Sequence, residues 1–410
     1  MTIQSSIAFS KGKDPHAIRF TDNGLQVGPD YIRVMAVYIT DQCNLSCVNC
    51  CSETVKTDSK ESMTLSPEAF KAAIDVYMDP QQFPYKGKKV ICIEGGETFL
   101  AYHTIIAGVE HAQKYPVPPH FYIHSNGTLV RPDWIKKLRE YDCEILFSID
   151  GDRGGNDRYR RFPYGSKKSV WDVIMKKLDR IPKEGLGVNM VLRPEALDGM
   201  ISAMKTFTDM GFPFVNFAMD YYYLWNEKEI ARLERFFDDF YDFFVAHTED
   251  TGKVPFLCGA IHDALNREAA LSLGQNWWQH CVHIILGSDG HFYACESIGM
   301  FNFSDVQDRY TLNKCDSDKG INWAKRNKWM DDADVMLGKN GRPDKEWQHM
   351  CPRLYAQVSE VEGTDPSDVV NMMHKTSRML RNSMIKIATR LREHPDFMKK
   401  HVAADVVQGS

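Results

Sequence analysis

Short apolar runs alternate with amphipathic stretches through the first half of the chain. Apolar runs typical of buried strands cover residues 32–39, 89–94, 120–125, 144–149, 187–192 and 214–218. Stretches with helical periodicity lie between them, at residues 66–78, 102–114, 132–141, 170–181 and 197–210. Strands that alternate with helices predict a parallel sheet with right-handed crossovers. The pattern therefore predicts an α/β fold, a partial (β/α)6 TIM-like barrel over residues 30–220.

The pattern changes on both sides of this predicted barrel. Residues 1–29 form an N-terminal extension, in which alternation around Asn23-Gly24 predicts a β-hairpin. An acidic, aromatic helix is predicted within a linking segment, residues 221–253. A small cysteine-bearing domain is expected at residues 254–365, and a basic, methionine-bearing helix within the C-terminal segment, residues 366–410.

Composition narrows the class of protein. The 410 residues are 43% hydrophobic and 26% charged, which is ordinary for a soluble protein. No apolar run approaches the roughly 18 residues that a membrane span needs, and the first residues lack the apolar region of a secretory signal. We therefore expect a cytoplasmic protein with no membrane partner. The formal charge of −5 argues against nucleic acid as the main partner.

Three of the eleven cysteines form a tight group directly after the first predicted strand. Cys43, Cys47 and Cys50 have C-x3-C-x2-C spacing. In a long chain without a secretory signal, clustered cysteines indicate metal binding or catalysis rather than disulfides. Three thiolates leave one metal position open, which is typical of a reactive site. The alternative is a structural zinc site, but its fourth ligand would have to be the adjacent Cys51, which is poorly placed.

This cysteine loop resembles the cluster loop of radical S-adenosylmethionine enzymes, and later strand ends match that family in order. Gly95-Gly96-Glu97 resembles the GGE motif that contacts the amino group of the cofactor, although Thr98 replaces the usual proline. Ser125-Asn126 resembles the ribose-contacting segment. Ser148 and Asp150 are similar to the strand end of the peptide-modifying branch, where the serine approaches the cofactor carboxylate. Arg160 follows where that branch often has an arginine.

The resemblance implies a particular chemistry. Cys43, Cys47 and Cys50 would hold a 4Fe–4S cluster, and its open iron would bind S-adenosylmethionine. One electron from an external donor of the flavodoxin or ferredoxin kind would then generate a 5′-deoxyadenosyl radical, which abstracts a hydrogen atom from the substrate. In such sites the cofactor carries the chemistry, and the protein supplies orientation and excludes water.

A second set of cysteines lies downstream, at Cys258, Cys281, Cys295, Cys315 and Cys351. Cys281 and Cys295 flank a predicted hairpin that turns at Ser288-Asp289-Gly290. The segment resembles a twitch or SPASM domain but lacks the cysteine run for a second auxiliary cluster. The resemblance implies one auxiliary 4Fe–4S cluster, with the ligands Cys258, Cys281, Cys295 and Cys351. Cys315 is either a replacement for Cys258 or a buried thiol, and a zinc knuckle or scattered core cysteines remain alternatives.

Two further residues have side chains that can exchange a proton, and only the first is a candidate for a role. Glu296 directly follows Cys295, where related peptide-oxidising enzymes can carry a general base. An equal alternative is a hydrogen-bonding role beside the cluster. His124 lies on an apolar strand, so we expect it to be a core residue with no role.

Three functions are consistent with these motifs. The first is oxidation or crosslinking of a ribosomally made peptide or protein side chain. Because the extension before the barrel is short for a peptide-binding domain, this hypothesis also expects a separate recognition protein. The second is dehydrogenation or epimerisation of a small molecule such as an aminosugar. The third is a binding protein that is stapled by zinc and is not an enzyme.

Overall fold

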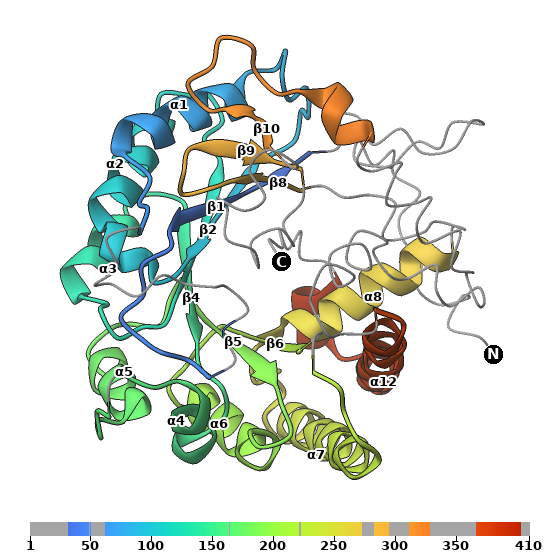
Figure 1. Ribbon diagram of the computed structural model, residues 1–410. Coiled ribbons are helices and arrows are strands. Elements are labelled where there is room, and N and C mark those ends of the chain that lie inside the picture. Colours follow the sequence, from blue (N-terminus) through green and yellow to red (C-terminus); the bar gives the residue numbers. More distant parts are fainter. Residues whose placement is uncertain are drawn as a thin grey trace.

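A ten-stranded sheet organises the part of the chain that the computed structural model describes, residues 32–48, 50, 62–163, 165–220, 223–272, 283–294, 311–328 and 366–402. Its first six strands in the chain are parallel neighbours, namely β1 (Val34–Thr40), β2 (Val90–Gly95), β3 (His120–Ser125), β4 (Cys143–Ser148), β5 (Leu186–Leu192) and β6 (Phe214–Met219). Each begins and ends within two residues of its predicted position, so the predicted parallel sheet is confirmed (Figure 1).

Helices connect these strands and cover the outer face of the sheet (Figure 1). They are α1 (Pro67–Met78), η3 (Thr98–Ala101), α2 (Tyr102–Ala112), α3 (Pro132–Leu138), α4 (Arg153–Tyr159), α5 (Val170–Leu178) and α6 (Leu197–Asp209). The α1 helix starts as its sequence predicts, because the Ser66 side chain accepts the Ala69 N–H and Pro67 occupies the first turn. The pattern did not predict α4, a short helix with two glycines.

The two faces of the sheet have different surroundings. Alternate strand residues such as Ile91 and Ile93 belong to the large core that packs against the helices. The residues between them form a second, smaller apolar cluster of Val34, Val90, Cys92, Tyr122 and Leu146. Since side chains alternate along a strand, this cluster lies on the inner face of the curved sheet. The inner face is the barrel lumen.

The sheet extends beyond the six predicted strands on both edges. On one side, β7 (Leu257–Cys258) pairs with β6. On the other, β8 (His283–Leu286) is parallel to β1, and β9 (His291–Tyr293) and β10 (Thr311–Lys314) continue in antiparallel order. The predicted hairpin at Ser288-Asp289-Gly290 is confirmed, and it lies directly beside the barrel. The N-terminal hairpin lies outside the described residues.

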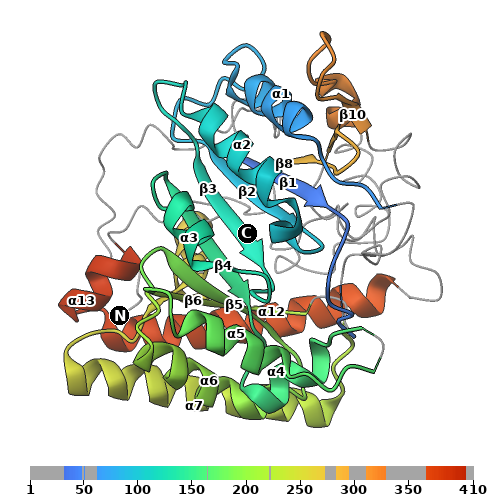
Figure 2. The same cartoon turned by 90° about the vertical axis from the view of Figure 1, so that its left-hand side faces the viewer.

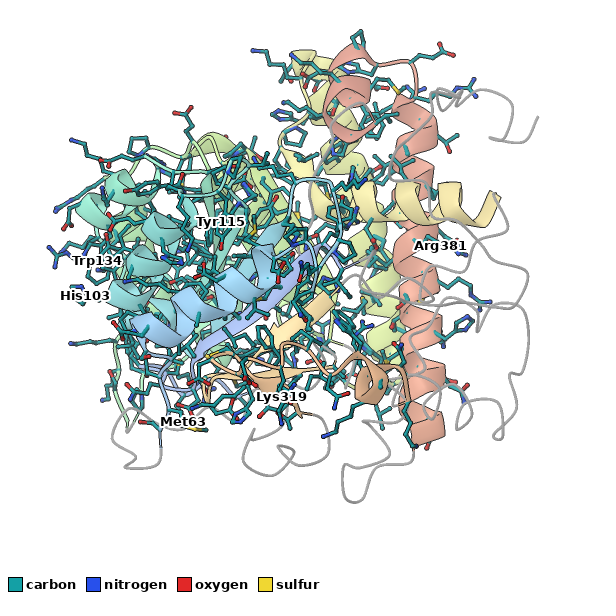
Figure 3. The ribbon with its side chains drawn as sticks, turned by 90° about the horizontal axis from the view of Figure 1, so that it is seen from above. Met63, His103, Tyr115, Trp134, Lys319 and Arg381 are labelled. Carbon is teal, nitrogen blue, oxygen red and sulfur yellow. The ribbon has the colours of Figure 1, made fainter. Side chains whose placement is uncertain are left out.

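The remaining helices follow β6 in the chain, and three of them are long. They are α7 (Glu227–Thr251), α8 (Gly259–Ser272) and α12 (Pro366–Leu391), followed by α13 (Pro395–Phe397) and η7 (Met398–Val402). Helix α12 packs against α7 and α8 (Figure 2). Seen from above, α12 with Arg381 lies across the molecule from His103 and Trp134 (Figure 3). None of the described helices is long and apolar enough to cross a membrane.

Candidate functional site

The loop that carries Cys43, Cys47 and Cys50 follows the carboxyl end of β1. Backbone hydrogen bonds hold its shape, because the Ser46 N–H donates to the Arg161 carbonyl at 2.7 Å and the Val48 N–H to the Tyr159 carbonyl at 2.9 Å. Cys43 and Cys47 are half-buried, whereas Cys50 is exposed. The loop therefore gathers the three thiols at the end of the barrel where parallel folds place their chemistry.

The charges around these thiols favour a bound cationic cluster. Burial raises the pKa of the Cys43 thiol to about 12, and the nearby Glu97 carboxylate and the other two thiols add to the rise. Burial also raises the pKa of Cys47, while the positive charge of Arg160 lowers it. Three neighbouring thiolates are therefore unfavourable without a compensating cation. Iron ions supply that compensation and ligate thiolates, so the donor set fits an iron–sulfur cluster.

Gly95 and Gly96 bring the end of β2 against the cluster loop. The Gly96 N–H donates to the Thr40 carbonyl at 2.8 Å, and the Glu97 N–H donates to the Gln42 carbonyl at 2.7 Å. A Cβ atom on Gly96 would lie 2.1 Å from the Gln42 carbonyl oxygen. Gly95 has φ +137° and faces the Thr40 carbonyl. Only glycine allows this approach of the two backbones.

The Glu97 carboxylate ties the ends of β2 and β3 together. It is fully buried. One oxygen accepts the Ser125 hydroxyl at 2.8 Å and the Phe99 N–H at 3.1 Å, and the other accepts the Asn126 N–H at 2.7 Å. Burial raises the pKa of the Glu97 carboxyl, whereas these hydrogen bonds and the positive charge of Arg160 lower it. The structure therefore brings the predicted residues Glu97, Ser125 and Asn126 into one hydrogen-bonded group.

A Glu97→Gln substitution is expected to lower the free energy of unfolding by about 1–3 kcal/mol, because the new amide N–H group would face a donor. Deoxyadenosine formation should fall about tenfold, a typical effect of removing a group that orients metal ligands. Chemical denaturation and a single-turnover assay measure the two effects. The Ser125→Ala variant leaves the carboxylate two of its donors. It should lower both the free energy of unfolding and deoxyadenosine formation by less than Glu97→Gln does. Equal losses would contradict the central role of the carboxylate.

Asn126 also connects this group to the cysteine loop. Its side-chain amide donates to the Asn44 carbonyl oxygen at 2.9 Å and approaches the Cys43 sulfur at 3.9 Å. The Asn44 amide in turn donates to the Thr128 hydroxyl at 2.8 Å. The sequence motifs did not single out Asn44 or Thr128. The sequence distinguishes them only by position, because Asn44 directly follows Cys43 and Thr128 lies two residues after Asn126.

The end of β4 supplies a buried ion pair. Asp150 accepts the Val191 N–H at 2.9 Å with one carboxylate oxygen and the Arg160 Nε–H at 2.8 Å with the other. This ion pair holds the Arg160 guanidinium in place, and its positive charge lowers the pKa of the Cys47 thiol. Ser148 is half-buried at the last position of β4. The predicted residues Asp150 and Arg160 are thus adjacent to the cysteine loop, and their contact with a cofactor stays a prediction.

A group of polar side chains that the motifs missed lies in the barrel lumen. Cys92 donates to a Glu94 carboxylate oxygen at 3.3 Å, and His124 Nε2 lies 3.9 Å from the same oxygen. The three ligand atoms lie within 4.8 Å of one another, so these residue types could hold a divalent metal ion. Burial raises the pKa of Glu94, while hydrogen bonds from Cys92 and Tyr38 lower it. The period of two along β2 could have shown that Cys92 and Glu94 share a face.

The downstream cysteines are only partly described. Cys258 is fully buried at the end of β7, and burial raises its thiol pKa to about 12. Cys315, directly after β10, is buried against the turn between β8 and β9, and its N–H donates to the Gly290 carbonyl at 2.8 Å. Four predicted residues lie outside the described part of the chain, namely Cys281, Cys295, Glu296 and Cys351. The auxiliary cluster and the base therefore stay predictions.

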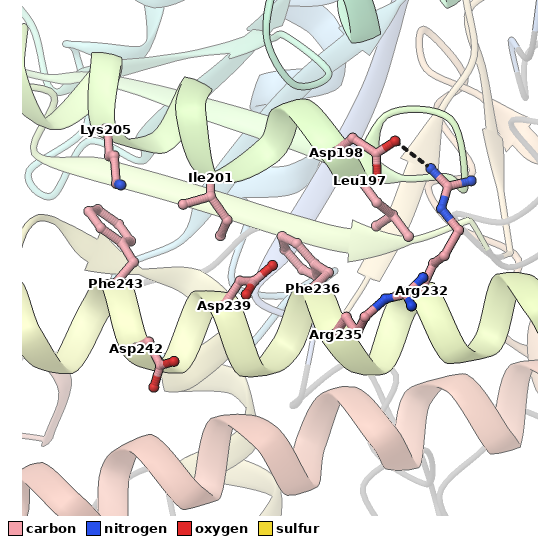
Figure 4. Close-up of a pocket in the computed structure, with 10 residues that line it drawn as sticks. All are labelled: Leu197, Asp198, Ile201, Lys205, Arg232, Arg235, Phe236, Asp239, Asp242 and Phe243. Atoms are coloured by element: carbon pink, nitrogen blue, oxygen red, sulfur yellow. Dashed lines mark hydrogen bonds and ion pairs between the residues drawn. The ribbon is translucent and has the colours of Figure 1, made fainter.

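A surface groove between α6 and α7 lies on the outer side of the barrel (Figure 4). Both acidic and basic side chains line it, and Arg232 pairs with Asp198 at 2.8 Å. Lys205 and Asp242 continue the same mixed pattern. Because both helices cover the outer face of the sheet, the groove is separate from the cysteine loop. Nothing in it indicates a reactive group.

Comparison with known proteins agrees with this description. The model of the radical SAM superfamily matches residues 37–207. A serine-type anaerobic sulfatase-maturating enzyme of Bacteroides thetaiotaomicron is 27% identical over 168 residues, which cover 39% of this chain and 38% of that protein. The chain therefore matches well under half the length of this curated relative.

Two solved structures share the fold. Native anSMEcpe with bound AdoMet and Cp18Cys peptide has a TM-score of 0.64 at 16% identity, over 87% of this chain and 99% of that one. Streptococcus suis SuiB bound to its precursor peptide SuiA has a TM-score of 0.52 at 12% identity, over 81% and 74% of the two chains. The matched residues 37–207 contain the cysteine loop and the strand ends that surround it, so this part of the chain is similar to the radical SAM superfamily of enzymes.

Proposed function

We propose that this enzyme is a maturase that removes a hydrogen atom from a side chain of a ribosomally made peptide or protein. The observation that carries the proposal is the three-thiol loop, bonded to the Glu97 and Asn126 group at the carboxyl ends of the strands. Three thiolates leave one iron of a four-iron cluster available to S-adenosylmethionine. Two proteins of the same fold hold peptides, which supports a peptide substrate.

Each group of the site has a separate task in this proposal. When bound, the cluster and S-adenosylmethionine supply a 5′-deoxyadenosyl radical that abstracts the hydrogen atom. Cys43, Cys47 and Cys50 would hold the iron. Glu97, through its three accepted hydrogen bonds, keeps the ends of β2 and β3 against the loop. Arg160, directed by Asp150, offsets the negative charge of the thiolates.

The second half of the reaction rests on residues downstream. After hydrogen abstraction the substrate radical has to lose one electron and one proton to complete an oxidation. In the proposal Cys258, Cys281, Cys295 and Cys351 would hold an auxiliary cluster, which would supply an acceptor for the electron, and Glu296 would accept the proton. The half-buried Glu94 and His124 line the lumen below the loop and would contact the substrate.

The proposal is tested with anaerobically reconstituted enzyme, S-adenosylmethionine and dithionite. A panel of peptides with serine, cysteine, tyrosine or lysine at a central position is compared with free aminosugars. We expect deoxyadenosine formation together with loss of two hydrogen atoms from a peptide. Deuterium at the reacting carbon should appear in the deoxyadenosine.

Other outcomes distinguish the alternatives. Turnover with a free aminosugar and with no peptide would overturn the peptide substrate but keep the radical chemistry. Bound zinc without iron would favour the binding protein. Iron-loaded protein that forms no deoxyadenosine under any condition would contradict the proposed activity.

A further inference from the structure

Two neighbouring strands place three possible metal ligands on the inner face of the sheet. Cys92 and Glu94 are two residues apart on β2, so both side chains point into the lumen. Cys92 pairs with Tyr122 on β3, and the next inward position along each strand brings Glu94 and His124 side by side. The three ligands therefore lie together on strands rather than on loops, which favours a fixed geometry.

The ligand atoms of these three side chains converge. The Cys92 sulfur lies 3.3 Å and the His124 Nε2 atom 3.9 Å from the same carboxylate oxygen of Glu94. All three atoms lie within 4.8 Å of one another. Ligand atoms around a tetrahedral zinc ion are about 3.3–3.6 Å apart, so rotation of the side chains would bring the group to that geometry.

The surroundings of the group leave one side open. Cys92 is buried in the smaller apolar cluster of the lumen. Glu94 and His124 each keep 21% of their side-chain surface exposed, which gives an ion a route to the site. Burial raises the pKa of the Glu94 carboxyl, and hydrogen bonds from Cys92 and Tyr38 and the charge of His283 lower it. A cation at this position would stabilise the charged carboxylate further.

The same strand ends are fixed from the other side. The Thr98 hydroxyl donates to the His124 carbonyl at 2.7 Å. Ser125, the next residue, donates its hydroxyl to the Glu97 carboxylate at 2.8 Å. The ligand group therefore lies directly beneath the hydrogen-bonded group of Glu97 and Ser125, on a backbone that both contacts hold in place.

We propose that Cys92, Glu94 and His124 bind one divalent metal ion of the zinc class in the lumen, separate from the three thiols of the cysteine loop. Zinc takes thiolate, carboxylate and imidazole ligands, and three protein ligands are typical of a site with an open fourth position. On binding, the Cys92 thiol releases its proton to solvent and each ligand atom donates a lone pair, so no electron is transferred. The fourth position would accept water or an oxygen or sulfur atom of a substrate. The site goes beyond the proposed function, because its occupation does not depend on radical chemistry.

The test uses the full, anaerobically reconstituted enzyme with its iron in place. The protein is dialysed against Zn²⁺ buffered by a chelator, and elemental analysis counts zinc and iron in the same sample. Glu94→Gln and His124→Gln each remove one ligand. The matched control is His120→Gln, which removes another histidine of β3 that contacts a carboxylate, with Nδ1 2.9 Å from Asp142. Circular dichroism checks the fold of each variant.

We expect wild type and the control to bind about one zinc ion per chain at unchanged iron content. Binding should weaken at least about 100-fold in Glu94→Gln and His124→Gln, since a lost ligand should cost more than the roughly 10–100-fold effect of a group that only orients one. With Co²⁺ in place of Zn²⁺, the difference spectrum should show sulfur-to-cobalt charge transfer. That absorption should persist in Cys143→Ala and disappear in Cys92→Ser.

Four results would overturn the metal site. The first is no zinc bound by the wild type. The second is zinc that the Glu94 and His124 variants retain in full, because the ion would then bind other residues. The third is loss of iron in proportion to the zinc taken up, which would place zinc on the cluster cysteines. The fourth is an equal loss of binding in His120→Gln, which would indicate damage to the sheet. None of these measurements needs turnover, so failure of the proposed function is distinguished from failure of the metal site.

Discussion

Replacing Cys43, Cys47 and Cys50 together with alanine is expected to abolish deoxyadenosine formation and to remove about four irons per chain. In the proposal the three thiols are the iron ligands of the loop; Asn126 approaches the Cys43 sulfur, and the positive charge of Arg160 acts on Cys47. The fold should persist, because all three residues lie outside the strands and at most half-buried. Iron analysis, deoxyadenosine assay and circular dichroism of the reconstituted protein measure these effects.

The matched control is Cys143→Ala, which removes a buried cysteine from the start of β4. Burial raises the pKa of the Cys143 thiol, as it does for Cys43. No other thiol contributes to the rise at Cys143. The control should keep its iron and its activity while losing some stability. Full activity in the triple variant would refute the assignment of the cluster. Loss of iron in the Cys143 variant would instead show a general failure of reconstitution.

Gly96→Ala is expected to reduce deoxyadenosine formation about 100-fold without removing any ligand. The added methyl group would lie 2.1 Å from the Gln42 carbonyl oxygen, a backbone atom that can move only with the cluster loop. A displacement of about 1 Å at a reacting centre typically has an effect of this size. Overpacking should also lower the free energy of unfolding by about 1–3 kcal/mol. Single-turnover kinetics and denaturant titration provide the two values.

Gly154→Ala is the control for backbone effects of a glycine substitution. A Cβ atom at Gly154, in α4, meets only the Asp152 side chain at 3.5 Å, an ordinary contact. That variant should be as active as the wild type and slightly more stable, since alanine favours a helix by about 1 kcal/mol over glycine. Comparable activity in the two variants would mean that the approach of β2 to the loop is not needed for catalysis.

The strands and their order could be predicted because the signals are local. A buried parallel strand is a short apolar run, and a helix between two such runs allows only a right-handed crossover. The residues that follow each strand then have to meet at one end of the barrel. This reasoning places Cys43, Glu97, Ser125 and Asp150 together without coordinates, and their hydrogen bonds and shared electrostatics agree with it.

Other features depend on contacts that no local pattern encodes. Helix α4 was missed because its glycines disfavour a helix, and it forms with the Asp152 side chain capping Gly155. The lumen group of Cys92, Glu94 and His124 depends on the register between β2 and β3, in which Cys92 pairs with Tyr122. The pairing of β8 with β1 joins residues about 250 positions apart.

The sequence by itself determined the class of fold, the end of the barrel that carries the chemistry and the three thiols of the loop, since each follows from spacing along the chain. Only the tertiary structure decided how that loop is held. The Glu97 carboxylate, the close approach of Gly96, and the carbonyl groups of Tyr159 and Arg161 act on it from distant positions in the chain. Hydrogen bonds and charges act over a few ångströms in space, so their partners are set by packing rather than by order in the chain.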